Sequence, residues 1–214
     1  GILDFGCVKI FDDAFLKAQR GTNSVQWASA TTLDEIRGGS GSDIVDLSGD
    51  QANMLVSITG TNAGWVRGSA SGMTQSSFAS NTAQAIKDAG DNAGRGFRFT
   101  GFENLVGGQG SDVFRMRDGA SLTGSLSGDT AAGLHHHADG NEIANARNTI
   151  DFSEYTRAVQ VNEEGDGAFG SANASAIKVR GFHNDVGGQA GDWLVGDGRN
   201  NLIVGNDGTD TLEG

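Results

Sequence analysis

The last part of the chain is organised as nine-residue lines. Residues 187–213 read as three such lines in unbroken register, GGQAGDWLV, GDGRNNLIV and GNDGTDTLE. Every line starts with glycine, carries Asp or Asn at its sixth place and has an aliphatic residue at its eighth. The sixth-place residues are Asp192, Asn201 and Asp210, and the eighth-place residues are Leu194, Ile203 and Leu212. A period this short, with a glycine turn in each line, leaves room only for short strands that stack on one another.

The same turn occurs twice earlier in the chain. Its first glycines are Gly38, Gly107 and Gly187, which are 69 and 80 positions apart. The second and third copies agree closely, as FENLVGGQGSD at residues 102–112 and FHNDVGGQAGD at residues 182–192. Together with alternating apolar and polar residues between the copies, this predicts an all-β fold, a right-handed parallel β-solenoid. We expect a solenoid with repeats of about 70–80 residues over residues 1–186, continuous with a truncated nonapeptide array over residues 187–214.

Three segments interrupt this rhythm. Residues 12–20 (DDAFLKAQR) have acids first, bases last and Gly21 just beyond, which predicts a short helix. Residues 76–89 have apolar residues at helical spacing and predict a second helix laid over the solenoid. Residues 125–147 are polar and small, which predicts a protruding loop. The three adjacent histidines of that loop, residues 135–137, lack the spacing of a metal site and are expected to be solvated.

The composition of the chain limits the kinds of structure it can form and the kinds of partner it can bind. The chain has 35 glycines and no proline, which favours hydrogen-bonded strands over a disordered segment. Its net charge of -12 disfavours nucleic acid and anionic membranes and favours cations. The single cysteine, Cys7, excludes an internal disulfide, and no apolar stretch reaches the roughly 18 residues of a membrane span. Because the sequence starts at Gly1 and stops on the first residue of a fourth line, we expect a piece of a longer chain.

The chemistry of the turn indicates calcium. Glycines allow backbone angles at which successive carbonyl oxygens turn toward one point, and the sixth-place Asp adds a carboxylate there. Carbonyl and carboxylate oxygens are the ligands of Ca²⁺. Burying one Leu or Ile gives roughly 1.5–3 kcal/mol, whereas ordering nine residues costs on the order of 9–18 kcal/mol. We therefore expect the array to need the ion in order to fold.

The lines resemble the RTX, or haemolysin-type, calcium-binding repeat family. The resemblance implies two nonapeptides per coil, so that the first and third lines stack and Asp192 and Asp210 share an ion. Asp207 would assist, and Asn201 would face the truncated fourth line. The candidate calcium ligands are Gly187, Gly188, Gln189, Asp192, Asp197, Asn201, Gly205, Asp207, Gly208 and Asp210. Two interpretations remain open for the isolated turns that end at Asp43 and Asp112, namely an ion ligand or a cap that bonds backbone amides.

The resemblance implies an extracellular bacterial protein exported unfolded and folded by calcium. Our first hypothesis is a non-catalytic structural and adhesive segment of a large surface or matrix protein of the adhesin and biofilm type. Surface polysaccharide or other matrix components are its candidate partners. The alternative is the calcium-binding module of a secreted protease, lipase or polysaccharide-modifying enzyme. A catalytic β-helix would need an exposed acid and base cluster, for which His183 and Asp185 are the nucleus. Trp27, Trp65 and Trp193 are either sugar-stacking or packing residues.

Overall fold

The described part of the chain consists of strands, turns and loops, and contains no helix. The structure is a computed structural model that describes residues 8–9, 16–17, 24–26, 35–48, 53–68, 96–128, 147–162, 168–170, 177–198 and 200–214. The strands are β1 (Val8–Lys9), β2 (Leu16–Lys17), β3 (Ser24–Gln26), β4 (Glu35–Arg37), β5 (Ile44–Asp46), β6 (Met54–Gly60), β7 (Ala63–Gly68), β8 (Gly96–Thr100), β9 (Asn104–Val106), β10 (Val113–Met116), β11 (Ser125–Ser127), β12 (Thr149–Asp151), β13 (Gln160–Asn162), β14 (Ala168–Gly170), β15 (Ile177–Arg180), β16 (Asn184–Val186), β17 (Trp193–Val195), β18 (Leu202–Val204) and β19 (Thr211–Glu213). The all-β prediction is confirmed for these residues.

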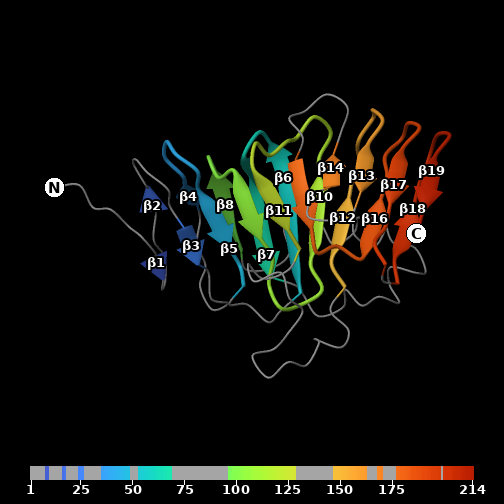
Figure 1. Cartoon of the computed structure of the whole chain (residues 1–214). Coiled ribbons are helices and arrows are strands. Elements are labelled where there is room, and N and C mark those ends of the chain that lie inside the picture. Colours follow the sequence, from blue (N-terminus) through green and yellow to red (C-terminus); the bar gives the residue numbers. More distant parts are fainter. Residues whose placement is uncertain are drawn as a thin grey trace, which may run out of the picture.

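The strands form two large sheets and one small one. The first large sheet has the order β1-β3-β5-β9-β11-β15-β14, and the second has the order β18-β16-β12-β10-β6-β7-β8-β4-β2. The small sheet has the order β13-β17-β19. The chain crosses from one sheet to another between most successive strands, and Figure 1 shows the strands advancing side by side from the N-terminal to the C-terminal end.

Most neighbouring strands are parallel. The exceptions are the antiparallel pairs β6 with β7, β7 with β8, and β14 with β15. The large sheets are therefore mixed, and none of the three closes on itself. A right-handed parallel β-solenoid stays a prediction.

The register at the C-terminal end has a step of two nonapeptides. Leu194 in β17 pairs with Leu212 in β19, and Asp185 in β16 pairs with Ile203 in β18, each 18 positions further along. The first and third lines of the array therefore lie directly beside each other, as the resemblance to the RTX repeat implies. Because β16 also pairs with β12, the array continues the sheet of the preceding residues.

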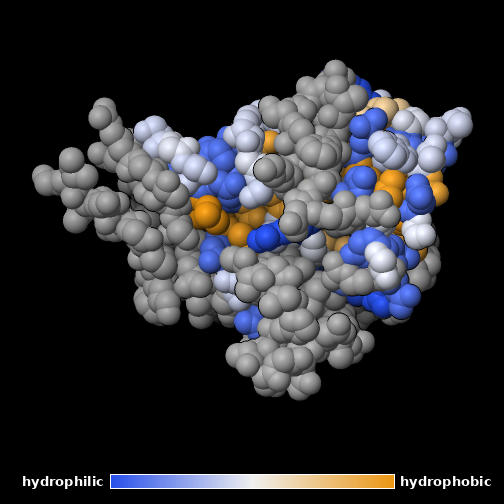
Figure 2. Space-filling model, in the orientation of Figure 1, coloured by the Kyte–Doolittle hydropathy of each residue, from blue (hydrophilic) through white to orange (hydrophobic). Residues whose placement is uncertain are grey.

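The described residues contain a large hydrophobic core cluster and a small one around Leu55, Val113 and Val186. The large cluster contains buried residues from both large sheets, such as Val45 and Phe114, and from the small sheet, such as Leu194. The eighth-place residues become more exposed toward the C-terminal end: Leu194 is fully buried, Ile203 is partly buried and Leu212 is 48% exposed, since β19 is an edge strand. Figure 2 shows apolar surface among polar residues at this end.

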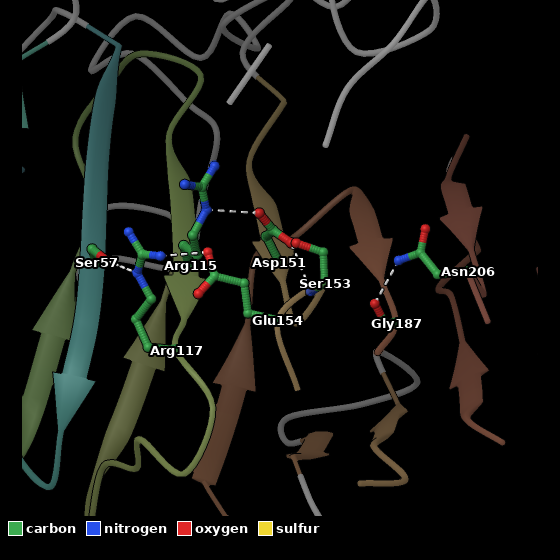
Figure 3. Close-up of polar contacts among 8 residues, drawn as sticks. All are labelled: Ser57, Arg115, Arg117, Asp151, Ser153, Glu154, Gly187 and Asn206. Atoms are coloured by element: carbon green, nitrogen blue, oxygen red, sulfur yellow. Dashed lines mark hydrogen bonds and ion pairs between the residues drawn. The ribbon is translucent and has the colours of Figure 1, made fainter. Parts of the chain in front are cut away.

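Polar side chains on neighbouring strands form a second, buried network. Arg115 in β10 donates from Nε to Asp151 Oδ2 in β12 at 3.0 Å, and both residues are almost fully buried. Asp151 also accepts the Ser153 amide, while Arg117 pairs with Glu154 at 2.5 Å (Figure 3). This network ties β10 to β12 and to the turn that follows β12.

Two segments differ from the sequence prediction. The helix near residues 12–20 is wrong at Leu16–Lys17, which form β2 and pair parallel with Ile36 and Arg37 of β4. Pairing along the sheet overrides the local helical pattern there. The loop over 125–147 begins as strand β11, which lies between β9 and β15. Residues 12–15 and 18–20 of the first segment and residues 129–146 of the second lie outside the described residues. The helix expected near 76–89 lies wholly outside them.

Candidate metal centre

The first glycine of each turn leaves space for the side chain five positions later. A methyl group built on any of these glycines would lie closer than 3.0 Å to an atom of that turn's own sixth-place side chain. The pairs are Gly38 with Asp43, Gly107 with Asp112, Gly187 with Asp192, Gly196 with Asn201, and Gly205 with Asp210. The sequence pattern of glycine at the first place and Asp or Asn at the sixth is therefore a packing requirement.

The sixth-place carboxylates cap their own turns. Asp43, Asp112 and Asp192 are buried, and the Oδ2 of each accepts the amide of the second-place glycine at 2.8, 2.7 and 2.5 Å. Asp112 Oδ1 also accepts the Met54 amide at 2.9 Å, and Asp192 Oδ1 accepts the Val159 amide at 2.8 Å. The capping role proposed for Asp43 and Asp112 is thus present, and Asp192 shares it.

A side chain from another part of the chain accepts the backbone amide of each of the three buried aspartates, Asp43, Asp112 and Asp192. The Asp43 amide donates to Glu103 Oε2 at 2.8 Å, and the Asp192 amide donates to Asp210 Oδ1 at 2.9 Å. The Asp112 amide donates to Asn148 Oδ1 at 2.9 Å. Two of the three turns therefore bring a second carboxylate to the aspartate, whereas the third brings a neutral amide. Sequence reasoning missed Glu103 and Asn148, because Glu103 stands at a place of the repeated passage where the third copy has His183, and Asn148 stands outside the repeated turns.

The Asp192 and Asp210 pair has unbalanced negative charge. Burial raises the pKa of the Asp192 carboxyl, and the charge of Asp210 raises it further, against the lowering effect of the Val159 and Gly188 amides. Two carboxylates close enough to perturb each other are stabilised when a cation lies beside them.

At the Asp112 turn, Asn148 occupies the place that Glu103 and Asp210 occupy at the other two turns. Its Nδ2 donates to Gly128 O at 2.7 Å and to Gly181 O at 3.2 Å. An amide that donates to two carbonyls and accepts one N–H satisfies the groups that a cation and a carboxylate would otherwise satisfy. These contacts favour the capping interpretation for Asp112.

Two further candidates, Gln189 and Gly208, lie around the stacked first and third lines, together with Asn206, which sequence reasoning did not single out. Gln189 is exposed, and its backbone amide donates to Tyr155 O at 2.8 Å. Asn206 has a positive φ of 67° and its Nδ2 donates to Gly187 O at 2.7 Å, a contact drawn in Figure 3. Gly208 has a φ of 123°, and a methyl group there would meet the Ala190 backbone at 2.5 Å. Glycine is thus required where the two turns approach each other.

Two candidates are placed differently from Asp192 and Asp210. Asp207 is exposed. Asn201 donates from Nδ2 to Asp197 Oδ1 at 3.3 Å, so these two residues of the second line contact each other. Among the described residues no group of three His, Cys, Asp or Glu side chains gathers as a metal site. An ion between the stacked turns would therefore draw part of its shell from backbone carbonyls, as the glycine pattern predicts.

The comparison with protein families agrees with this geometry. Residues 34–51 and 186–214 match the RTX calcium-binding nonapeptide repeat, in four copies. The chain carries RTX repeats. Repeats of this family bind calcium and occur in secreted proteins, so the matched residues indicate a calcium-binding segment of a secreted protein. The match also takes in the Asp43 turn, one of the two isolated turns.

No curated protein and no solved structure matched the chain. In the described part of this RTX-repeat chain, no helix has the length and apolar character needed to cross a membrane.

Asp185 does not lie on an exposed face, contrary to what the catalytic β-helix hypothesis needs. Its exposed fraction is 0%, so it cannot form a surface cluster with His183. Of the tryptophans, Trp193 is 44% exposed and Trp65 packs beside buried Leu55 and Val113, with Arg67 over its ring at 4.5 Å. Trp27, Cys7 and the histidines at 135–137 lie outside the described residues.

Proposed function

We propose that this chain is a calcium-binding structural and adhesive segment of a secreted bacterial RTX-type surface or matrix protein. In this proposal it winds as a right-handed parallel β-solenoid that calcium stabilises. The crossing of successive strands between sheets and the mostly parallel pairing support the solenoid.

The observation that carries the proposal is the contact between Asp192 and Asp210. The 18-residue register puts the two turns side by side, and the Asp192 amide donates to Asp210 Oδ1 at 2.9 Å. Two carboxylates, completed by carbonyl oxygens of the glycine turns, would form a donor set that suits Ca²⁺ rather than Zn²⁺. When bound, the ion would neutralise the pair and hold the first and third lines together. The Asp43 turn, with Glu103, has the same kind of donor set, whereas the Asp112 turn has a neutral partner.

Calcium-dependent folding follows from the thin core of the array. Ile203 is only partly buried and Leu212 is 48% exposed, so apolar burial contributes little to the last two lines. Without a cation, the Asp192 and Asp210 charges oppose the stacking that the register requires. An ion that binds only the folded array shifts the equilibrium toward it.

The adhesive role rests on the resemblance to RTX proteins and on the display of loops by a stiffened scaffold. The charge of -12 suits an extracellular segment that collects cations. Surface polysaccharide is the proposed partner, and the segment itself is proposed to be non-catalytic. Retention of the labelled chain on bacterial surface polysaccharide, with calcium and with chelator, tests this part.

The central experiment is the thermal unfolding of the whole chain in calcium and in chelator, with magnesium as the control ion. A ligand at 100 times its Kd stabilises by about 2.7 kcal/mol, or roughly 5–11 °C for a domain of this size. We expect a rise of that order in calcium and a smaller one in magnesium. An unchanged melting temperature in calcium would refute calcium-driven folding.

A further inference from the structure

Three arginines form a diagonal line on the outward face of the second large sheet. They stand on the neighbouring strands β4, β8 and β7, whose other face carries core residues such as Ile36, Phe99 and Val66. Because side chains alternate between the two faces of a strand, the residues next to these core residues point outward. The outward arginines are Arg37 in β4, Arg98 in β8 and Arg67 in β7.

The register spaces these arginines evenly. Arg37 pairs with Thr100, two residues after Arg98, and Arg67 pairs with Gly96, two residues before Arg98. Each step of the diagonal therefore moves one strand sideways, about 4.8 Å, and two residues along the strand, about 6.7 Å. Neighbouring arginines are thus roughly 8 Å apart at their Cα atoms. This regular spacing suits a ligand that carries its charges at intervals, rather than a single small anion.

Trp65 and a fourth arginine lie beside the diagonal. Trp65 pairs with Arg98, and Cζ of Arg67 is 4.5 Å from the centre of the Trp65 ring. Trp65 also pairs with Ser57, whose Oγ accepts a hydrogen bond from Arg117 Nε at 3.4 Å (Figure 3). We refer to Trp65 and the four arginines, Arg37, Arg67, Arg98 and Arg117, as the arginine face.

The arginine face is accessible to a ligand. Arg37 and Arg98 are exposed, and Arg67 and Arg117 are partly exposed. Nη1 of Arg67 is buried without a hydrogen-bond partner, while the cation–π contact with Trp65 holds the guanidinium in place. The planar fork of a guanidinium binds both oxygens of a carboxylate, so a ligand carboxylate would supply the acceptor that Arg67 lacks.

The arginine face is positive, although the whole chain has a net charge of -12. Arg117 has an acidic partner, Glu154. Lys17 and Glu35 are register neighbours of the diagonal, and their opposite charges cancel. Among the residues that the structure describes, an excess of positive charge therefore remains here, and it attracts anions locally.

We propose that the arginine face binds a polysaccharide that carries carboxylate groups. The inference rests on the polysaccharide partner of the proposed function, and it names the binding surface and the chemistry of the ligand. A polysaccharide with acidic sugars presents carboxylates at regular intervals along a chain, as the diagonal requires. Nucleic acid fits less well, because a duplex has one charge per about 1.7 Å and is repelled by the net negative charge of the chain. The arginine face is separate from the nonapeptide lines at residues 187–213, so calcium and polysaccharide would occupy different parts of the chain.

The test is binding of the whole chain, at saturating calcium, to fluorescently labelled hyaluronan oligosaccharides, followed by fluorescence anisotropy. Uncharged dextran oligosaccharides and oligothymidylate are the comparison probes. The variants Arg37→Gln and Arg98→Gln each remove one exposed charge and should weaken hyaluronan binding about 2- to 5-fold, and the double variant roughly 4- to 25-fold. Arg180→Gln is the matched control, since Arg180 is also exposed but stands on β15 of the first large sheet, and it should bind as the wild type does. Melting temperatures equal to that of the wild type will show that the variants are folded.

The outcomes separate this inference from the proposed function. If the wild type binds hyaluronan and the double variant binds it equally well, the arginine face is not the site, whereas the adhesive function stands. Equal binding of dextran and hyaluronan by the wild type likewise refutes the charge-based site alone. Tighter binding of oligothymidylate than of hyaluronan would make the face a nucleic-acid site and overturn the proposal. A wild type that binds neither hyaluronan nor dextran contradicts both the site and the adhesive function.

Discussion

Substituting Gly187 by alanine tests the packing rule on which the calcium turns depend. The added methyl group would meet the Asp192 carboxylate and would lie 2.7 Å from the carbonyl oxygen of Gly205 in the neighbouring turn. The chain cannot easily shift away, because the Gly187 amide donates to Val204 O at 2.8 Å. Either the Asp192 carboxylate moves or the two turns separate.

The expected cost has two parts. Overpacking against a backbone atom costs about 1–3 kcal/mol. Moving the carboxylate also weakens the hydrogen bond that the Gly188 amide donates to Asp192 Oδ2 at 2.5 Å. The loss of such a hydrogen bond costs about 1 kcal/mol more. The sum, about 2–4 kcal/mol, lowers the melting temperature by roughly 4–16 °C in a domain of this size.

Gly198→Ala is the matched control in the next turn. A methyl group there has no atom within 4 Å. The substitution should leave the stability unchanged or raise it by about 0.4–1 kcal/mol, because alanine restricts the unfolded chain.

Urea unfolding at fixed calcium, followed by tryptophan fluorescence, gives the free energy of unfolding for the three proteins. Calcium titration of the same samples reports whether the displaced Asp192 carboxylate also lowers the affinity for the ion. Equal midpoints for Gly187→Ala and the wild type would falsify the rule that the first glycine makes room for the sixth-place side chain. A loss as large in Gly198→Ala would show that the effect is not one of packing.

Three further predictions follow from the charges. Asp192→Asn removes one charge of the turn pair and replaces one of the two oxygens that accept the Gly188 and Val159 amides, so it should bind calcium more weakly and also lose about 1–3 kcal/mol in chelator, as melting in both conditions will show. Asp151→Asn leaves the buried Arg115 guanidinium without its counter-charge and should cost about 3–5 kcal/mol in urea unfolding, whereas Arg117→Met, at a pair that is 28% and 23% exposed, should cost at most about 1 kcal/mol. In chelator, the raised pKa of Asp185, about 7, means that the folded chain holds a proton which the unfolded chain releases. Its contribution to stability is therefore present at pH 4 and is lost as the pH rises toward 7, by at most about 4 kcal/mol. This contribution of Asp185 is measured by comparing the urea midpoints of the wild type and Asp185→Leu at pH 4 and pH 7. Equal changes of the midpoint with pH in both proteins would contradict the prediction.

The sequence by itself determined the architecture of the last lines. A nine-residue period fixes which side chains face inward, since each line repeats the same turn and the same short strand. The resemblance of the lines to the RTX repeat implied that Asp192 would lie beside Asp210, and the pairing of β17 with β19 agrees. Glycine at the first place and Asp or Asn at the sixth could be paired from the sequence, because their contact is local to one turn.

Only the tertiary structure decided which side chain from another part of the chain contacts each turn. The groups that accept the amides of Asp43, Asp112 and Asp192 lie 60, 36 and 18 positions away, because segments of different length separate the stacked turns. No local pattern shows that one partner is Glu103 and another the neutral Asn148.

The same holds for the strand at Leu16–Lys17 and for the buried position of Asp185. Residues 12–20 have a helical pattern, and an aspartate is ordinarily a surface residue, so local preferences point the other way in both cases. Sheet pairing settles the conformation of β2, and the register of β16 between β12 and β18 places the Asp185 carboxylate inside. Long-range pairing determines these features because the free energy of extending a sheet and closing a core exceeds the preference of any single residue.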